Sequence, residues 1–294
     1  MCSGSPRELS VLTDDGVALS GEETGPARPG AGGFPIVLLH GLTATRRYVV
    51  MGSRLLERSG HRVIAYDARG HGRSSPAADG GGRAQMEAAY GYERLARDLE
   101  AVLDALQIPR AALAGASMGA HTALRFALER PARVAALGIV TPAFDPTASE
   151  VDAPEGNRNV LARALRESGV EGFVRAYDFS TVPSAWRETV ERVVRQRLSL
   201  HEHPEAVADA MEVVSRSRPF GNFAELAAIA VPTVVVASRD EVDPGHPLAL
   251  AERYARAIPA ATLTVEDGGP PLRSPIAWQG GQLSKVLVEL LARA

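Results

Sequence analysis

Short apolar runs alternate with amphipathic stretches along most of the chain. The apolar runs, which predict buried strands, occupy residues 35–39, 62–66, 111–114, 134–140, 232–237 and 261–265. Stretches with the spacing of a helix occupy residues 47–59, 92–107, 123–128, 247–257 and 279–292. Strands that alternate with helices indicate an α/β fold, in which a mostly parallel sheet carries helices on both faces.

Two regions depart from this alternation. Residues 8–13 and 16–22 alternate in polarity around Asp14-Asp15-Gly16, which predicts a β-hairpin. Residues 142–220 contain only helical stretches, at 157–168, 170–178, 184–200 and 204–215. We therefore expect a core made of residues 1–141 and 221–294, with residues 142–220 inserted as a helical cap.

The clearest chemical signal is a serine between two glycines. The run Gly115-Ala116-Ser117-Met118-Gly119 follows a predicted strand and leads into a predicted helix. Small residues permit a tight turn that lifts the serine out of the sheet, and the helix N-terminus offers unpaired amides to a developing negative charge. The five-residue pattern also fits a turn that merely packs a helix against a sheet, but its strand-to-helix context favours catalysis.

Other polar residues fall at equivalent places. His40 and Asp67 each follow a predicted strand, as Ser117 does. Ligands of parallel α/β sheets bind at the carboxyl ends of the strands. The three residues therefore predict a site at that edge.

Together these segments resemble the α/β-hydrolase superfamily over nearly the whole chain. The resemblance rests on His40-Gly41, on Asp67-x-Arg69-Gly70-x-Gly72-x-Ser74, on the turn around Ser117, and on Ser238-Arg239-Asp240. It implies that Ser117 is a nucleophile and that the amides of Leu42 and Met118 form an oxyanion hole. It also implies that Asp240 orients the base, with Asp243 as the second choice, and that the cap covers a small-molecule substrate.

The chain departs from the family pattern at the base. The family places its catalytic histidine after the last strand, yet residues 265–272 contain no histidine and none follows His246. His246 is one candidate, and it also reads as a solvent-facing residue at a helix start. His121, one helical turn past Ser117, is a second. In a third interpretation Glu266 or Asp267 takes the place of the base, or the site has none.

The remaining polar residues of these motifs have less specific interpretations. In the family pattern His40 shapes the oxyanion loop, and Asp67 and Arg69 fix that loop. We expect His71 to stabilise its turn. His61, His201 and His203 are expected at the surface, and no metal site is expected because His201-x-His203 has no further ligands in sight.

Composition narrows the class of protein. A formal net charge of −3 gives no reason to expect nucleic acid or an anionic membrane as a partner. Cys2 stands alone, and neither a signal peptide nor a membrane span is recognisable, so we expect a cytoplasmic protein. The sequence predicts a cofactor-independent serine hydrolase acting on an ester or related acyl compound. The alternative is a non-hydrolytic member of the fold, either a lyase-like catalyst or a small-molecule binding protein.

Overall fold

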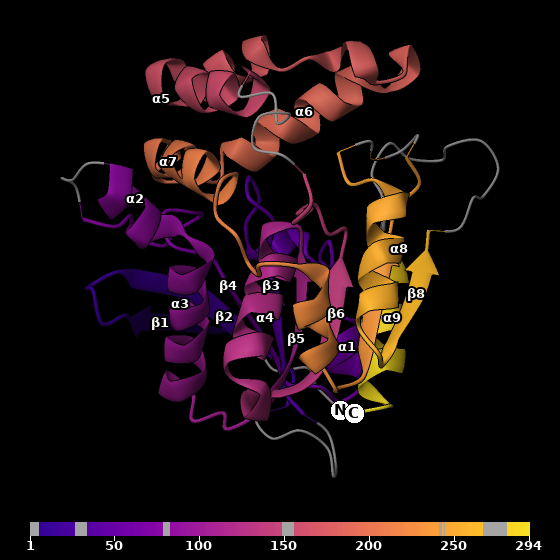
Figure 1. Ribbon diagram of the computed structural model, residues 1–294. Coiled ribbons are helices and arrows are strands. Elements are labelled where there is room, and N and C mark those ends of the chain that lie inside the picture. The colour runs from indigo at the N-terminus through magenta and orange to yellow at the C-terminus, as the bar shows by residue number, and fades with distance from the viewer. Residues whose placement is uncertain are drawn as a thin grey trace.

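The described residues of the computed structural model form a central sheet covered by helices, with a further helical layer above one edge (Figure 1). Described are residues 6–26, 34–78, 83–148, 156–240, 243, 245–266 and 281–294. The strands are β1 (Arg7–Leu12), β2 (Ala18–Thr24), β3 (Ile36–Leu39), β4 (Val63–Tyr66), β5 (Ala111–Ala116), β6 (Val134–Val140), β7 (Thr233–Ala237) and β8 (Ala261–Val265).

The strand order is β1-β2-β4-β3-β5-β6-β7-β8. The predicted hairpin is confirmed, because β1 pairs with β2 in antiparallel orientation and β2 joins β4 in the same way. From β4 to β8 every pairing is parallel. The predicted α/β-hydrolase fold is therefore confirmed.

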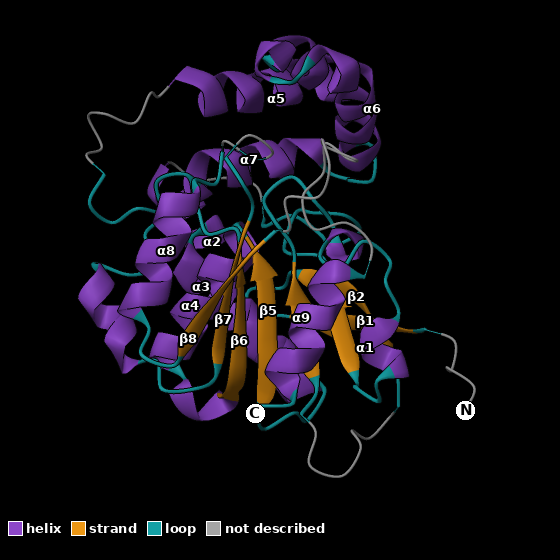
Figure 2. Cartoon of the chain, turned by 90° about the vertical axis from the view of Figure 1, so that its right-hand side faces the viewer, coloured by secondary structure: helices purple, strands orange, loops and turns teal. Residues whose placement is uncertain are grey.

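The helices of the described residues, apart from α2, lie in three groups. Their bounds are α1 (Leu55–Arg58), α2 (Arg83–Tyr90), α3 (Tyr92–Ala105), α4 (Met118–Glu129), α5 (Gly156–Ala176), α6 (Arg187–Leu198), α7 (Pro204–Val214), α8 (Leu248–Ala257) and α9 (Gln282–Leu291). Helices α3, α4 and α8 cover one face of the sheet, and α1 and α9 cover the other (Figure 2). Helices α5, α6 and α7, here called the helical layer, lie above the carboxyl ends of the parallel strands (Figure 1).

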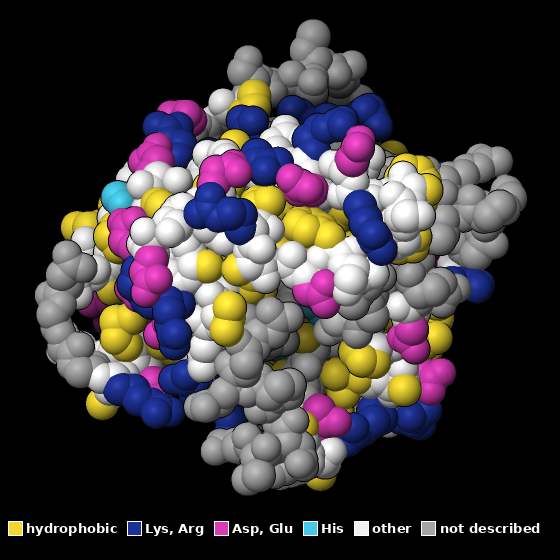
Figure 3. All heavy atoms as spheres, turned by 90° about the horizontal axis from the view of Figure 1, so that it is seen from above, with side chains coloured by type: hydrophobic (Ala, Val, Ile, Leu, Met, Phe, Trp, Pro, Cys, Tyr) yellow, Lys and Arg dark blue, Asp and Glu magenta, His cyan; other side chains and the backbone are white. Residues whose placement is uncertain are grey.

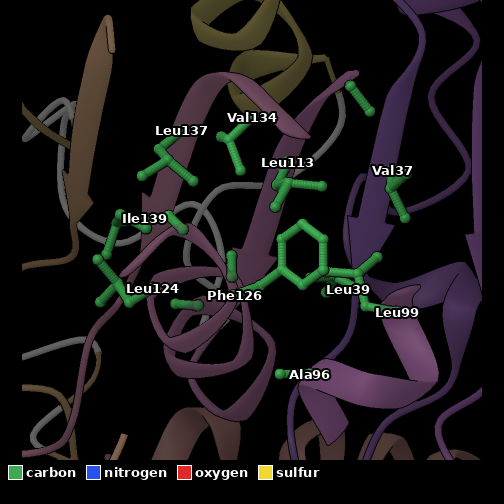
Figure 4. Packing of buried hydrophobic residues seen from close by; sticks show 14 of the residues in the cluster. Val37, Leu39, Ala96, Leu99, Leu113, Leu124, Phe126, Val134, Leu137 and Ile139 are labelled. Carbon is green, nitrogen blue, oxygen red and sulfur yellow. The ribbon is translucent and has the colours of Figure 1, made fainter. Parts of the chain in front are cut away.

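Alternation along the strands builds two cores. Val37 and Leu39 of β3 pack toward α3 and α4, in the cluster centred on Phe126 (Figure 4). Their neighbours Ile36 and Leu38 face the other side and meet α9. Successive side chains of a strand point to opposite faces, so continuous apolar runs are what a sheet covered on both sides requires.

The helical layer has a core of its own. Phe173 of α5, Leu198 of α6 and Met211 of α7 are buried together. Helix α5 is interrupted at Gly169, whose φ of 60° is left-handed, and this is where the sequence separates two helical stretches. These helices fall inside the predicted cap 142–220; the division into core and cap stays a prediction.

The predicted helix 47–59 is wrong in extent: only a short 3₁₀ turn (Arg46–Tyr48) and α1 form, because Met51 and Gly52 take positive φ values. No helix within the described ranges is long and apolar enough to cross a membrane. The face seen in Figure 3 mixes acidic and basic side chains. Within the helical layer, Arg166 forms an ion pair with Asp209.

Candidate active site

The turn around Ser117 is built by close backbone packing. Ser117 has φ 50° and ψ −110°, a strained conformation between β5 and α4. A Cβ on Gly115 would lie 2.2 Å from the carbonyl carbon of Gly119, and one on Gly119 would lie 2.2 Å from the Leu39 carbonyl oxygen. The glycines therefore let three backbone segments meet, and the serine sits at their junction.

A histidine and a carboxylate meet this serine. His246 Nε2 lies 3.0 Å from Ser117 Oγ, and Nδ1 of the same ring lies 2.9 Å from both carboxylate oxygens of Asp243. The loop between β7 and α8 supplies both residues, and its turn is closed by a hydrogen bond from the His246 amide to the Asp243 carbonyl. Because Asp243 can only accept, Nδ1 carries the proton and Nε2 faces the serine hydroxyl as an acceptor.

The structure does not place Asp240 beside His246, contrary to the preference for Asp240 over Asp243. Its exposed carboxylate accepts a hydrogen bond of 2.7 Å from the Leu248 amide, at the first residue of α8. Asp240 thus holds the start of a helix, where unpaired amides favour a negative charge. Asp243, three residues along, reaches the histidine because the turn folds residue 246 back over it.

The alternative bases lie elsewhere. His121 is buried on α4, where Nε2 accepts hydrogen bonds of 3.2 Å from the amides of Ala143 and Phe144 and Nδ1 meets the Tyr92 hydroxyl. Glu266 continues β8 through a backbone bond to Ala237, and no contact between its carboxylate and Ser117 occurs in the part of the chain that is described. Asp267 lies outside the described residues.

The predicted oxyanion amides flank the serine. Met118 is the first residue of α4, so its N–H has no acceptor within the helix. Leu42 follows Gly41, which lies close to the serine: a Cβ added to Gly41 would be 3.7 Å from the Cβ of Ser117. Within the described ranges neither amide donates a hydrogen bond to the protein. Both are thus available to an oxygen bound beside Ser117.

Buried ion pairs hold the neighbouring loops. The Asp67 carboxylate forms an ion pair with the Arg46 guanidinium and also accepts a hydrogen bond of 2.8 Å from the Arg46 backbone amide. Arg69 is completely buried and is bound by Asp98 and Asp15. These hydrogen-bonded ion pairs fix the loop that follows β4.

The expectation that His201 lies at the surface is wrong. It is 8% exposed and its ring stacks edge-on against His71, which in turn neighbours His40. A polar segment between two helices gave no sign of burial, because the groups that bury His201 are distant in sequence. No cluster of three or more side chains suited to a metal ion occurs among the described residues.

A parallel α/β sheet with a serine, a histidine and a carboxylate gathered at its carboxyl edge defines the class of α/β hydrolases. The chain belongs to the alpha/beta hydrolase fold family, whose model matches residues 35–272.

Similar proteins agree with this assignment. A relative from Variovorax paradoxus named "Putative carbamate hydrolase RutD" is 31% identical, over 90% of this chain and 93% of its own length. A 2-hydroxy-6-oxononadienedioate/2-hydroxy-6-oxononatrienedioate hydrolase from Cupriavidus pinatubonensis is 27% identical over 80% of each chain. The enol-lactonase from Burkholderia xenovorans shares the fold, with a TM-score of 0.72, 24% identity and coverage of 97% of this chain and 100% of that one.

Proposed function

We propose that the protein is a serine hydrolase that cleaves an ester or a related acyl compound through an acyl-Ser117 intermediate. The observation that carries the proposal is the hydrogen-bonded series from Ser117 Oγ to His246 to Asp243. A serine hydroxyl is a weak nucleophile until a base lies within hydrogen-bond reach, about 2.6–3.2 Å. His246 meets that requirement from the β7–α8 loop.

The first half of the reaction follows from these positions. As Ser117 Oγ attacks the acyl carbon, its proton passes to His246 Nε2, and Asp243 stabilises the imidazolium through Nδ1–H. The amides of Leu42 and Met118 bind the oxygen that becomes negative. The intermediate then collapses, the leaving group takes the proton from Nε2, and the acyl group remains on the serine.

The second half repeats these steps with water. His246 takes a proton from a water molecule, which attacks the acyl carbon, and the same amides bind the oxyanion. The acid is released when the bond to Ser117 Oγ breaks and the serine recovers its proton from Nε2. This chemistry requires no cofactor.

Arg197 bears on the charge of the substrate. This half-buried residue of α6 has no hydrogen-bond partner at Nε, and no described residue forms an ion pair with it. Burial lowers its pKa, while the neighbouring Tyr177, Tyr48 and Asp243 act in the opposite direction. A guanidinium without a partner favours an anionic ligand, so we infer a substrate that carries a carboxylate. The dioate named for the Cupriavidus relative is of that class.

The charge inference is tested with two esters of one leaving group, one neutral and one bearing a carboxylate. Arg197→Gln should raise KM for the acidic ester and leave KM for the neutral ester unchanged. Arg195→Gln is the matched control, since Arg195 on the same helix already pairs with Glu171 and Glu191. Equal KM changes for both esters would exclude a role in recognising charge.

The hydrolase proposal is tested by labelling with a fluorophosphonate probe, which reports an activated serine. Wild type should label, Ser117→Ala should not, and His246→Ala should label about 10²–10⁴-fold more slowly. His203→Ala serves as a histidine control at a more exposed position. If His246→Ala labels at the wild-type rate, His246 is not the base. If folded wild type does not label, hydrolysis is abandoned for the lyase-like or binding alternative, and ligand screening follows.

A further inference from the structure

Three histidines contact successive carbonyls of residues 40–43, the loop that carries the proposed oxyanion amide and is here called the oxyanion loop. The carbonyls of Gly41, Leu42 and Thr43 each meet the ring of a different histidine. His40 Nδ1 lies 2.8 Å from the first oxygen, His71 Nε2 lies 2.5 Å from the second, and His201 Nε2 lies 3.3 Å from the third.

The three histidines come from separate parts of the fold. His40 belongs to the loop itself, and His71 belongs to the loop after β4. His201 lies between α6 and α7 and therefore belongs to the helical layer. Their rings form a continuous row, with centroids 5.2 Å apart from His40 to His71 and 5.5 Å apart from His71 to His201.

The protonation of the two outer rings follows from their partners. His40 Nε2 accepts from the Ala68 amide, and His201 Nδ1 accepts from the Gly72 amide, each at 2.9 Å. The other nitrogen of each ring therefore carries the proton and donates to the oxyanion loop. Burial, reinforced by the neighbouring His71, lowers the pKa of both His40 and His201 to about 3, which keeps them neutral.

Further contacts join the helical layer to the oxyanion loop and to the loop that contains Gly72. The Glu202 amide donates to the Gly72 carbonyl at 2.9 Å, and the Gly72 amide donates to His201 Nδ1. Two hydrogen bonds of opposite direction therefore join Gly72 to the segment 201–202. The side chain of Leu42 packs against the core of the helical layer and also against the cluster that contains Met118. The oxyanion loop thus lies between the nucleophile and the helical layer.

Peptide geometry turns these contacts into an effect on catalysis. In a trans peptide the carbonyl and the following amide point in opposite directions, so the Thr43 carbonyl shares a rigid plane with the Ala44 amide and the Gly41 carbonyl shares one with the Leu42 amide. The Ala44 amide donates to the Gly41 carbonyl at 3.0 Å, so the bond from His201 to Thr43 acts on the Leu42 amide through this turn. We propose that His201 is a positioning residue for the reaction: it ties the oxyanion loop to the helical layer, so that this layer sets the alignment of the Leu42 amide. This inference rests on the proposed serine-hydrolase function.

The test uses two substitutions that separate the bonds of His201. In His201→Asn the amide oxygen can replace Nδ1 as acceptor for Gly72, while the donor to Thr43 is lost. In His201→Gln the amide nitrogen can replace Nε2 as donor to Thr43, while the acceptor for Gly72 is lost. His203→Asn is the matched control, because His203 lies in the same segment and pairs only with Glu205 at its side chain among the described residues.

We expect His201→Asn to lower kcat about tenfold with KM unchanged, since complete loss of an oxyanion donor costs about 10²–10³ and a displaced donor costs less. Inhibition by a boronic acid, which mimics the tetrahedral intermediate, should weaken by the same factor. His201→Gln should retain more of kcat than His201→Asn, and His203→Asn should match wild type. Unchanged kcat in folded His201→Asn would overturn the proposal.

A second readout is independent of activity. Hydrogen exchange of the peptide spanning residues 40–46 should be faster in His201→Asn than in wild type or His203→Asn. If wild type neither labels with fluorophosphonate nor hydrolyses esters, the proposed function fails, yet faster exchange still supports positioning by His201. If kcat falls and exchange in this peptide is unchanged, the effect does not pass through the oxyanion loop and the inference is wrong.

Discussion

The two halves of the candidate site are built differently. Ser117 and the oxyanion loop are held by the core: the Ser117 amide donates to Val140, the glycines are packed against backbone, and three histidines bind consecutive carbonyls. His246 and Asp243 stand on a loop outside the sheet, and their side chains are 25% and 28% exposed.

The difference separates two physical tasks. A nucleophile and an oxyanion hole act through fixed backbone geometry, which only tightly packed elements can supply. A base needs one hydrogen bond in the correct tautomer, and a short turn that pairs a histidine with a carboxylate supplies it. The base can therefore occupy another loop while the nucleophile stays where the fold places it.

The largest effect should come from the carboxylate behind the base. Asp243→Asn can present an N–H to His246 and favour the wrong tautomer, so we expect kcat to fall by about 10³–10⁴-fold. Ester hydrolysis under saturating substrate measures it. Asp240→Asn is the matched control: it keeps an acceptor for the Leu248 amide, and its kcat should stay close to wild type. A larger loss in Asp240→Asn than in Asp243→Asn would restore Asp240 as the orienting acid.

A pair of glycine substitutions compares the rigidity of the two halves. Gly119→Ala would place a Cβ 2.2 Å from the Leu39 carbonyl oxygen, so β3 and α4 must separate. We expect a loss of about 3 kcal/mol or more in the free energy of unfolding. Gly245→Ala, whose Cβ would lie 3.6 Å from Asp243 Oδ1, should lose less than about 1 kcal/mol. Urea unfolding of both variants gives the values, and equal losses would contradict the contrast.

What the sequence predicted follows the same division. Local patterns of glycine and apolar residues predict the turn at Ser117, the strands on either side of it and the helical stretch 142–220. His246 was identified only as one of several candidate bases, and Asp240 was preferred to Asp243, because a choice between carboxylates three residues apart depends on how one turn folds. The burial of His201 depends on contacts with Gly72 and Thr43, which are more than a hundred residues away in sequence.

The buried histidines make stability depend on pH in a defined direction. The pKa of His40 and of His201 is lowered to about 3 from the ordinary 6.5, mainly by burial. Between these values the unfolded chain binds protons that the folded chain does not, so acidification favours unfolding by up to about 1.4 kcal/mol per pH unit for each histidine. The stabilisation is complete above pH 6.5 and is lost as pH falls toward 3.

Urea unfolding as a function of pH measures this slope. His201→Gln removes one of these groups, so its slope should be shallower by up to about 1.4 kcal/mol per pH unit. Identical slopes in wild type and His201→Gln would show that His201 does not titrate between folded and unfolded states.

The smallest effect on activity should come from His121, the histidine nearest to Ser117 along the chain among the alternatives. In His121→Gln the amide oxygen can replace Nε2 as acceptor for the Ala143 and Phe144 amides, while the contact to Tyr92 is lost. We expect unfolding to become easier by about 1 kcal/mol, the net value of one hydrogen bond, with the labelling rate unchanged. Ser117 directly precedes helix α4 and His121 lies in its first turn, yet their side chains face different partners. Slower labelling in a folded His121→Gln protein would therefore mean that the base acts from the rigid half of the site. Normal labelling would leave the β7–α8 loop as its source.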